Sequence, residues 1–494
     1  MNKLLDGLKE KTNLTTTENG ALTHKTSKSY VLDYFAQGSA LRNRNEDSIM
    51  SLFNDAFQED SLLAMKVLFN SRDVRGGQGE RKTFRTIINN LAINNPEVIE
   101  KNIEFIPFFG RWDDLYALFN TPLEKKAIEL IKKQLDEDIK SDNPSLCAKW
   151  LASENASSKQ TKELATKTRV GLKMTSKQYR KMLSSLRKKI KIIETLITNK
   201  DYSSIEYDKV PSQAGLKYKS CFWENDSERY SKFLESVNKG EKKINVGTLS
   251  PYEIVSKVPK YNCWGKNREL SLEERKTLNT MWEQLPNYVE DKFENAIAVV
   301  DVSGSMEGTP MDIAISLGLY LAEKSKGEFA NHFITFESNP SLVEIKGKDF
   351  VEKVQNISRA SWGGSTNIKK VFNLILKTAI KKQITQAEMP SRIIIISDME
   401  FDMAQGYYYD DNYDYAPLFE TIKQEFKDAG YEIPRLVFWN ANSRQNNIPM
   451  TMDENVQLVS GASPRLFTQV LKDYSAYELM LEVLNDKRYD CVTV

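Results

Sequence analysis

The most constraining feature of the sequence is a change in the spacing of its apolar residues near residue 296. From there on, short apolar runs alternate with stretches that carry apolar residues at helical spacing. The runs lie at 296–300, 332–336, 342–345, 392–396, 435–439 and 456–459. Continuously apolar strands separated by helices are typical of a mostly parallel sheet covered on both faces. The sequence therefore predicts an α/β domain over residues 290–494.

A short polar motif follows the first of these runs. Asp301, Ser303 and Ser305 place one carboxylate and two hydroxyls in a tight turn at the end of a strand. Gly304 lets the backbone turn without a Cβ clash. Carboxylate and hydroxyl oxygens are the ligands that Mg²⁺, Mn²⁺ and Ca²⁺ prefer. The motif therefore predicts a site for a divalent cation, with Mg²⁺ as the first choice and Mn²⁺ or Ca²⁺ as alternatives.

Two later loops add oxygen ligands to this motif. Thr366 follows a glycine pair at 363–364, and Asp398 follows the apolar run 392–396. Ligands of open α/β sheets bind beyond the carboxyl ends of the strands, where neighbouring loops converge. We therefore expect Thr366 and Asp398 to join the first motif, with Glu400 and Asp402 as additional carboxylates nearby.

This set of residues resembles the metal-ion-dependent adhesion site of von Willebrand A domains. The resemblance implies that Ser303, Ser305 and Thr366 ligate the ion directly, while Asp301 and Asp398 act largely through water. It also implies an open coordination position that a carboxylate of a partner protein can fill. The fold class expected for the whole chain is α + α/β, with a helical, repeat-like domain before a Rossmann-like von Willebrand A domain.

The part of the chain before residue 290 has a different character. Residues 1–28 are polar and are expected to form a flexible leader. Residues 29–285 carry apolar residues at helical spacing, interrupted by glycine and proline breaks, which predicts a domain of short helices.

A basic segment lies within this helical region. Residues 159–200 hold 13 Lys or Arg against two acidic residues, and the stretch 179–193 has the pattern of an amphipathic helix. The basic residues that we take as candidate partner contacts are Arg180, Lys181, Arg187, Lys188 and Lys189. They could bind the phosphate backbone of RNA or DNA, or they could form the solvated face of a packed helix. A third alternative is an intramolecular pairing with the acidic stretch 398–432.

A glycine-rich loop at 72–81 is the second candidate partner site. Arg72, Arg75 and Arg81 flank three glycines, and backbone N–H groups together with guanidinium groups can hold a phosphate. The alternative is a turn between helices that is tied by Arg–Asp pairs. The loop lacks the Gly-Lys-Ser/Thr ending of a nucleotide-binding P-loop, so no nucleotide cofactor is expected.

Several segments together resemble a known family, domain of unknown function 2828. These segments are Arg72–Arg81, Gly110-Arg111-Trp112-Asp113-Asp114-Leu115, Lys149-Trp150-Leu151, Tyr179-Arg180-Lys181, Val210-Pro211-Ser212 and the metal motif. The order of a helical region followed by a metal-site A domain also resembles the Ro/TROVE ribonucleoproteins. That resemblance implies a helical ring that binds small structured RNA.

The remaining composition narrows the classes of function. The chain has two histidines and four widely spaced cysteines, which disfavours His-based catalysis and zinc sites and is typical of free thiols in the cytoplasm. No apolar run is long enough for a membrane span. We expect a binding protein without catalysis, with a protein carboxylate or structured RNA as its partner. A metal-dependent phosphoester hydrolase is disfavoured because no second metal site or general base is evident.

Overall fold

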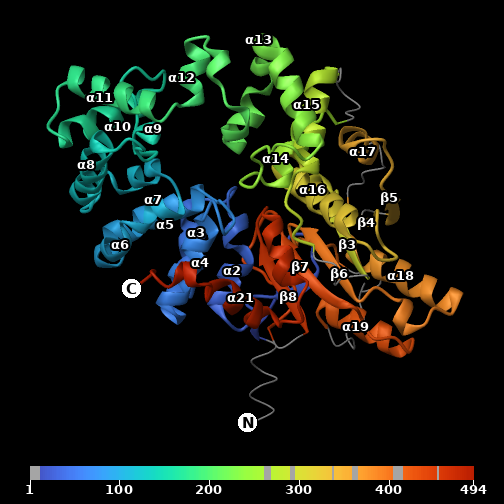
Figure 1. Ribbon diagram of the computed structural model, residues 1–494. Helices are drawn as coiled ribbons and strands as arrows, with labels where there is room; N and C mark the ends of the chain where they lie inside the picture. Colours follow the sequence, from blue (N-terminus) through green and yellow to red (C-terminus); the bar gives the residue numbers. More distant parts are fainter. Residues whose placement is uncertain are drawn as a thin grey trace. The chain divides into compact units, whose positions relative to one another are not determined.

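The computed structural model describes residues 12–260, 269–289, 295–336, 339–358, 365–403, 416–452 and 455–494 (Figure 1). The chain divides into two compact units. Unit 1 takes the chain up to Val67 and then Leu249–Asp486, and unit 2 takes Leu68–Thr248 and Lys487–Val494. This division differs from the expected boundaries at residues 28 and 285, because segments that precede residue 68 pack against the sheet of unit 1.

Unit 1 is built on one six-stranded sheet. Its strands are β3 (Ala296–Asp301), β4 (His332–Phe336), β5 (Ser341–Glu344), β6 (Arg392–Ser397), β7 (Arg435–Asn440) and β8 (Val456–Ser460). They lie in the order β5-β4-β3-β6-β7-β8, with β5 antiparallel to β4 and the other neighbours parallel. All six strands expected from the apolar runs are confirmed, as is the mostly parallel sheet.

Helices cover both faces of this sheet, as successive residues of β7 make clear. The ring of Phe438 packs edge-on against Phe419 of α19 (Leu418–Asp428), 4.7 Å between centroids. The next ring, Trp439, packs against Phe467 of α20 (Phe467–Val470) at 4.9 Å. Because successive side chains of a strand point to opposite faces, α19 and α20 lie on opposite sides of the sheet.

The helix that follows the motif of Asp301, Ser303 and Ser305 lies especially close to the sheet. It is α16 (Thr309–Lys324), which packs on β3, β4 and β6. A Cβ added at Gly318 would lie 2.4 Å from Cγ2 of Val300 in β3, so only glycine allows this approach. The other helices of unit 1 are α2 (Tyr30–Gln37), α3 (Glu46–Glu59), α14 (Pro251–Val255), α15 (Leu272–Glu283), α17 (Phe350–Ile357), α18 (Ile368–Lys382) and α21 (Ala476–Leu484).

Two segments that precede residue 68 belong to this unit. Helix α2 packs on β7 and β8, and its buried face includes Val31, Leu32 and Tyr34. Strands β1 (Leu14–Thr16) and β2 (Leu22–His24) form an antiparallel hairpin. The expected flexible leader therefore contains ordered structure from residue 12 onward; residues 1–11 lie outside the described residues. Composition does not reveal this hairpin, because hydrogen bonds rather than an apolar core attach it.

Unit 2 is helical, as expected for this part of the chain. Its helices are α5 (Lys82–Asn94), α6 (Pro96–Asn102), α7 (Phe105–Phe109), α8 (Glu124–Lys140), α9 (Cys147–Trp150), α10 (Lys159–Gly171), α11 (Ser176–Lys189), α12 (Ile193–Thr198) and α13 (Ser212–Asn238). Helix α4 (Ser61–Arg72) crosses the boundary between the units. Across the described part of the chain, no helix combines the length and the apolar character that a bilayer span requires.

Candidate functional site

The strand order places the ends of β3 and β6 together. From β3 the chain continues to β4 on one side, and it later returns to place β6 on the other side of β3. Such a reversal of direction is where ligands of open α/β sheets bind. Asp301 is the last residue of β3, and Asp398 directly follows the last residue of β6.

Asp301 is fully buried and held by two short hydrogen bonds. Its Oδ1 accepts from the backbone N of Ser303 at 2.9 Å, and its Oδ2 accepts from the hydroxyl of Ser397 at 2.6 Å. Burial, and next the negative charge of Asp398, raise the pKa of Asp301 to about 7. The two carboxyl groups thus interact electrostatically inside the protein, and a cation between them would relieve that repulsion.

The hydroxyl oxygens of Ser303 and Ser305 lie 3.1 Å apart. Two oxygens bound at right angles to one Mg²⁺, each about 2.1 Å from the ion, are separated by about 3.0 Å. The two serines therefore already have the spacing of neighbouring ligands in an octahedral shell. In the structure they form a hydrogen bond with each other.

Asp398 has one oxygen without a hydrogen bond. Its Oδ1 accepts from the backbone N of Glu400 at 3.1 Å, whereas its Oδ2 is buried and has no hydrogen-bond partner. The guanidinium of Arg444 lies 3.6 Å from that oxygen. Met399 adopts a left-handed backbone with φ of 68° directly after Asp398, an uncommon conformation for a side chain of this size. Buried polar atoms nearly always have a hydrogen-bond partner, so this oxygen, which Arg444 faces without a hydrogen bond, is an exception.

Thr366 lies beside the loop that carries Asp398. Its backbone oxygen accepts from the N of Asp402 at 3.0 Å, and its hydroxyl accepts from the side chain of Asn19 at 3.1 Å. The glycines at 363–364 that precede it in the sequence lie outside the described residues. The structure thus links Thr366 to the loop after β6, and Ser303 and Ser305 to Asp301 in the turn after β3.

The structure adds three residues to this site that the sequence did not predict. Glu18 and Asn19 lie in the turn between β1 and β2, and Arg444 lies after β7. The backbone N of Glu18 donates to Glu400 at 2.6 Å, and burial raises the pKa of Glu400 to about 7. Nothing in their local sequence marks these residues, because the hairpin and the loop after β7 are polar and lack a motif.

The glycine-rich loop at 72–81 is tied into unit 2 by ion pairs and hydrogen bonds. Arg72 is buried and pairs with Asp114, with 2.7 Å between Nη2 and Oδ2. Asp73 is bound by Arg488, at 2.9 Å from Nη2, and by the hydroxyl of Tyr489 at 3.2 Å. Arg75 donates to the backbone oxygen of Phe108 at 3.0 Å. The alternative reading, a turn tied by Arg–Asp pairs, therefore describes this loop; Arg81 is exposed.

The same network reaches the Gly-Arg-Trp-Asp-Asp segment. Arg85 pairs with both Asp113 and Asp114, at 2.8 and 2.7 Å. Arg111 pairs with Asp113 and stacks on the ring of Trp150, with 3.9 Å to the centroid. Segments that resemble the family at 72–81, 110–115 and 149–151 thus meet in one network of charges, in which Arg72 and Asp114 are buried and the other charged members are partly exposed.

The basic helix, α11, is partly engaged with its own unit. The guanidinium of Arg187 donates to the backbone oxygens of Ala148 and Leu151 and to the hydroxyl of Ser153, each at 2.8 Å. Lys189 donates to two backbone oxygens at the end of α8, at 3.0 and 3.2 Å. Arg180, Lys181 and Lys188 are exposed. Residues 404–415 of the acidic stretch 398–432 lie outside the described residues.

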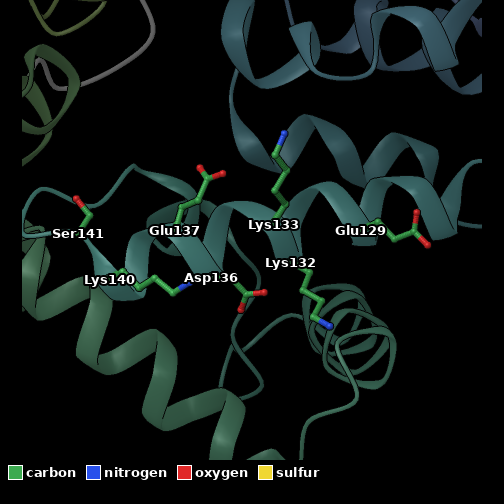
Figure 2. A pocket seen from close by; sticks show the side chains of 7 residues that line it. All are labelled: Glu129, Lys132, Lys133, Asp136, Glu137, Lys140 and Ser141. Atoms are coloured by element: carbon green, nitrogen blue, oxygen red, sulfur yellow. The ribbon is translucent and has the colours of Figure 1, made fainter.

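A hollow of about 750 Å³ runs along α8 in unit 2. Figure 2 shows that Lys133 and Glu137 leave one side of the helix while Lys132 and Asp136 leave the other. The lining residues are Glu129, Lys132, Lys133, Asp136, Glu137, Lys140 and Ser141. Lysines and carboxylates alternate along this surface, so it offers no concentrated charge to a ligand.

Fold and site together define a class of protein in which an all-helical unit is joined to an α/β unit with carboxylates and hydroxyls at its strand ends. The chain belongs to the family Domain of unknown function (DUF2828), whose model matches residues 17–145 and 144–293. A second model, Domain of unknown function (DUF7788), matches residues 295–490.

Two individual proteins are similar to this chain. "Uncharacterized protein L728" of Acanthamoeba polyphaga mimivirus is 31% identical over 517 residues, covering 96% of this chain and 87% of the relative. Among solved structures, the RO (RSR) protein of Deinococcus radiodurans matches with a TM-score of 0.34 and 13% identity. That match covers 92% of this chain and 93% of the other.

Proposed function

We propose that this protein is a non-catalytic binding protein whose α/β unit is a von Willebrand A-type domain with a metal-ion-dependent adhesion site. The site would hold Mg²⁺ through Ser303, Ser305 and Thr366, with Asp301 and Asp398 acting largely through water. The observation that carries the proposal is the pair of serine hydroxyls 3.1 Å apart, in the turn whose backbone binds the buried Asp301 carboxyl.

The charge of the site supports this proposal. Asp301 and Asp398 are 0% and 1% exposed, and isolated buried charges are costly unless a cation compensates them. Arg444, 3.6 Å from Asp398, supplies one positive charge at the rim. A bound divalent ion would compensate both carboxylates and would offer an open coordination position to a carboxylate oxygen of a partner protein.

Hydrolytic chemistry has less support. A phosphoester hydrolase of the two-metal type gathers several carboxylates or histidines around a pair of ions. Within the described residues, no group of three or more His, Cys, Asp or Glu has the arrangement of a metal site. The proposed single-ion site relies on hydroxyl oxygens instead, so we assign no catalytic residue.

Metal-dependent thermal stabilisation tests the proposal. At Mg²⁺ concentrations 100-fold above Kd, a single site should stabilise the wild-type chain by about 2.7 kcal/mol, and EDTA should reverse this. Asp301→Ala should abolish that response while circular dichroism shows the fold retained. The exposed Asp55→Ala in α3 serves as the matched control and should respond like wild type. An unchanged response of Asp301→Ala would refute the assignment.

RNA binding by unit 2 is the second candidate. It is favoured by the exposed cationic residues Arg180, Lys181 and Lys188 on α11. Binding of a structured RNA through these residues should weaken steeply between low and moderate salt, which fluorescence anisotropy measures directly. RNA binding that does not change with salt would remove α11 from consideration.

A further inference from the structure

The turn between β1 and β2 is attached along the loop that carries Asp398. The hydroxyl of Thr17 donates to the backbone oxygen of Phe401 at 2.7 Å, and the N of Met403 donates to the oxygen of Asn19 at 3.1 Å. Gly20 forms an antiparallel bridge with Asp402. The turn therefore follows the rim of the candidate metal site over several consecutive residues.

The carboxylate of Glu18 is bound by two side chains of the loop after β7. Its Oε2 lies 2.5 Å from Nη2 of Arg444, and its Oε1 accepts from the amide of Gln445 at 2.9 Å. The other guanidinium nitrogen of Arg444 lies 3.6 Å from the buried Asp398 oxygen. One arginine thus connects the Glu18 carboxylate to a residue of the proposed metal shell.

The neighbouring side chain, Asn19, contacts the shell directly. Its amide nitrogen donates to the hydroxyl of Thr366 at 3.1 Å and to the backbone oxygen of Glu400 at 2.6 Å. A carboxylate and a carboxamide from one turn therefore contact Arg444 at the rim of the candidate site and Thr366 of its proposed shell.

We propose that the turn 17–20 is an internal stand-in for the partner, and that Arg444 and Gln445 form the subsite that receives an acidic side chain of that partner. This inference rests on the proposed function and adds to it a subsite for an acidic peptide segment, which the Glu18 carboxylate occupies in the structure. Partner binding then requires the Glu18 carboxylate to leave Arg444.

The contact is built to be reversible. The side chains of Glu18 and Arg444 are 30% and 36% exposed, so water screens their attraction and can replace either partner. A tethered ligand competes at a high effective concentration, so it lowers the apparent affinity of any external ligand for the same subsite. Neutralising Glu18 should therefore strengthen external binding.

A synthetic peptide with the sequence of residues 13–24, labelled with fluorescein, serves as the probe. In Mg²⁺, it should bind the full-length Glu18→Gln variant roughly fivefold more tightly than wild type, as expected for a partly exposed ion pair. The same peptide with Gln in place of its own Glu should bind weakly to both. Glu46→Gln, which changes an exposed residue in the first turn of α3, is the matched control and should resemble wild type.

Two outcomes separate this inference from the proposed function. The double variant Glu18→Gln/Arg444→Gln should lose peptide binding but keep Mg²⁺-dependent thermal stabilisation. Equal peptide affinity of wild type and Glu18→Gln, or no binding to either, would overturn the inference even if Mg²⁺ still stabilises the chain. Loss of Mg²⁺ stabilisation in the wild-type chain would instead contradict the proposed function.

Discussion

The guanidinium of Arg72 and the carboxylate of Asp114 meet 2.7 Å apart in the interior of unit 2, where their side chains are 2% and 0% exposed. The residues are 42 positions apart, at the end of α4 and just after α7. Asp114 also pairs with Arg85 at 2.7 Å, so one buried carboxylate compensates two guanidinium groups. This pair, rather than a bound phosphate, accounts for the first arginine of the glycine-rich loop.

Arg72→Met should destabilise the chain by about 3–5 kcal/mol, because it leaves a buried carboxylate with one cationic partner fewer. Asp114→Asn should cost at least as much, since it removes the carboxylate that compensates the buried Arg72 and leaves Arg85 to Asp113. Urea unfolding followed by circular dichroism measures both. As the control, Arg81→Met changes an exposed residue and should stay within about 0.5 kcal/mol of wild type. If Arg72→Met also lost only about 0.5 kcal/mol, the structural role of Arg72 would be contradicted.

Asp33 in α2 predicts a pH dependence of stability. Burial raises the pKa of Asp33 from 3.8 to about 6, although Ser27 donates a hydrogen bond to it at 2.8 Å. The native state therefore holds this proton where the unfolded chain releases it. The contribution of Asp33 to the free energy of unfolding falls as pH rises from about 4 to about 6, by up to about 3 kcal/mol, and is constant above that window.

Asp33→Asn should remove this contribution while keeping an oxygen that accepts from Ser27. The free energy of unfolding of the variant, relative to that of wild type at the same pH, should be higher at pH 7 than at pH 4.5 by about 2 kcal/mol. Chemical denaturation at the two values measures this difference. Asp55→Asn, on the exposed side of α3, is the control, and an Asp33→Asn difference that is the same at both pH values would contradict the burial argument.

The spacing of Ser303 and Ser305 predicts a graded metal response. Each single change to alanine removes one hydroxyl ligand and should weaken Mg²⁺ binding by about tenfold or more, and the double variant should show no response at attainable concentrations. Mg²⁺ and Mn²⁺ should stabilise the wild-type chain more than Ca²⁺, which binds oxygens at 2.3–2.6 Å and prefers more ligands. Calorimetric titration measures the affinities; stronger binding of Ca²⁺ would indicate a different ligand set.

Arg187 and Lys188 are adjacent in α11 and should behave differently. Arg187→Met removes three hydrogen bonds to the segment 148–153 and should destabilise unit 2 by about 2–3 kcal/mol. Lys188→Met should leave stability nearly unchanged, but it should reduce the salt dependence of any RNA binding by about one phosphate contact. Unfolding and anisotropy titrations on the same pair of variants separate the two roles, and equal destabilisation by both would contradict this assignment.

The parts of the fold that the sequence predicts are those with local signals. The sheet was predictable because most of its strands contain continuous apolar runs, as at 393–396, and because helical spacing separates most of them. The oxygens after β3 were predictable because three of them lie within five residues. These signals do not depend on which distant segment packs beside them.

The parts that escaped prediction depend on distant partners. The strands β1 and β2 are three residues long, and their attachment uses the edges of polar loops rather than apolar burial. Arg72 was a reasonable phosphate ligand until Asp114 was found beside it. Glu18, Asn19 and Arg444 meet at the candidate site because unit 1 is formed by segments that precede and follow residues 68–248 of unit 2 in the sequence.

The contact between α2 and β8 has a consequence for the synthesis of the protein. Phe35 in α2 and Ser460 in β8 share a hydrogen bond of 2.9 Å although 425 residues separate them. At about 5–20 residues per second, the ribosome takes roughly 20–85 s to deliver the strand on which this helix rests. During that time the apolar side of α2 that packs on β7 and β8 has no native surface to cover it, so we expect a chaperone to shield that side until translation is almost complete.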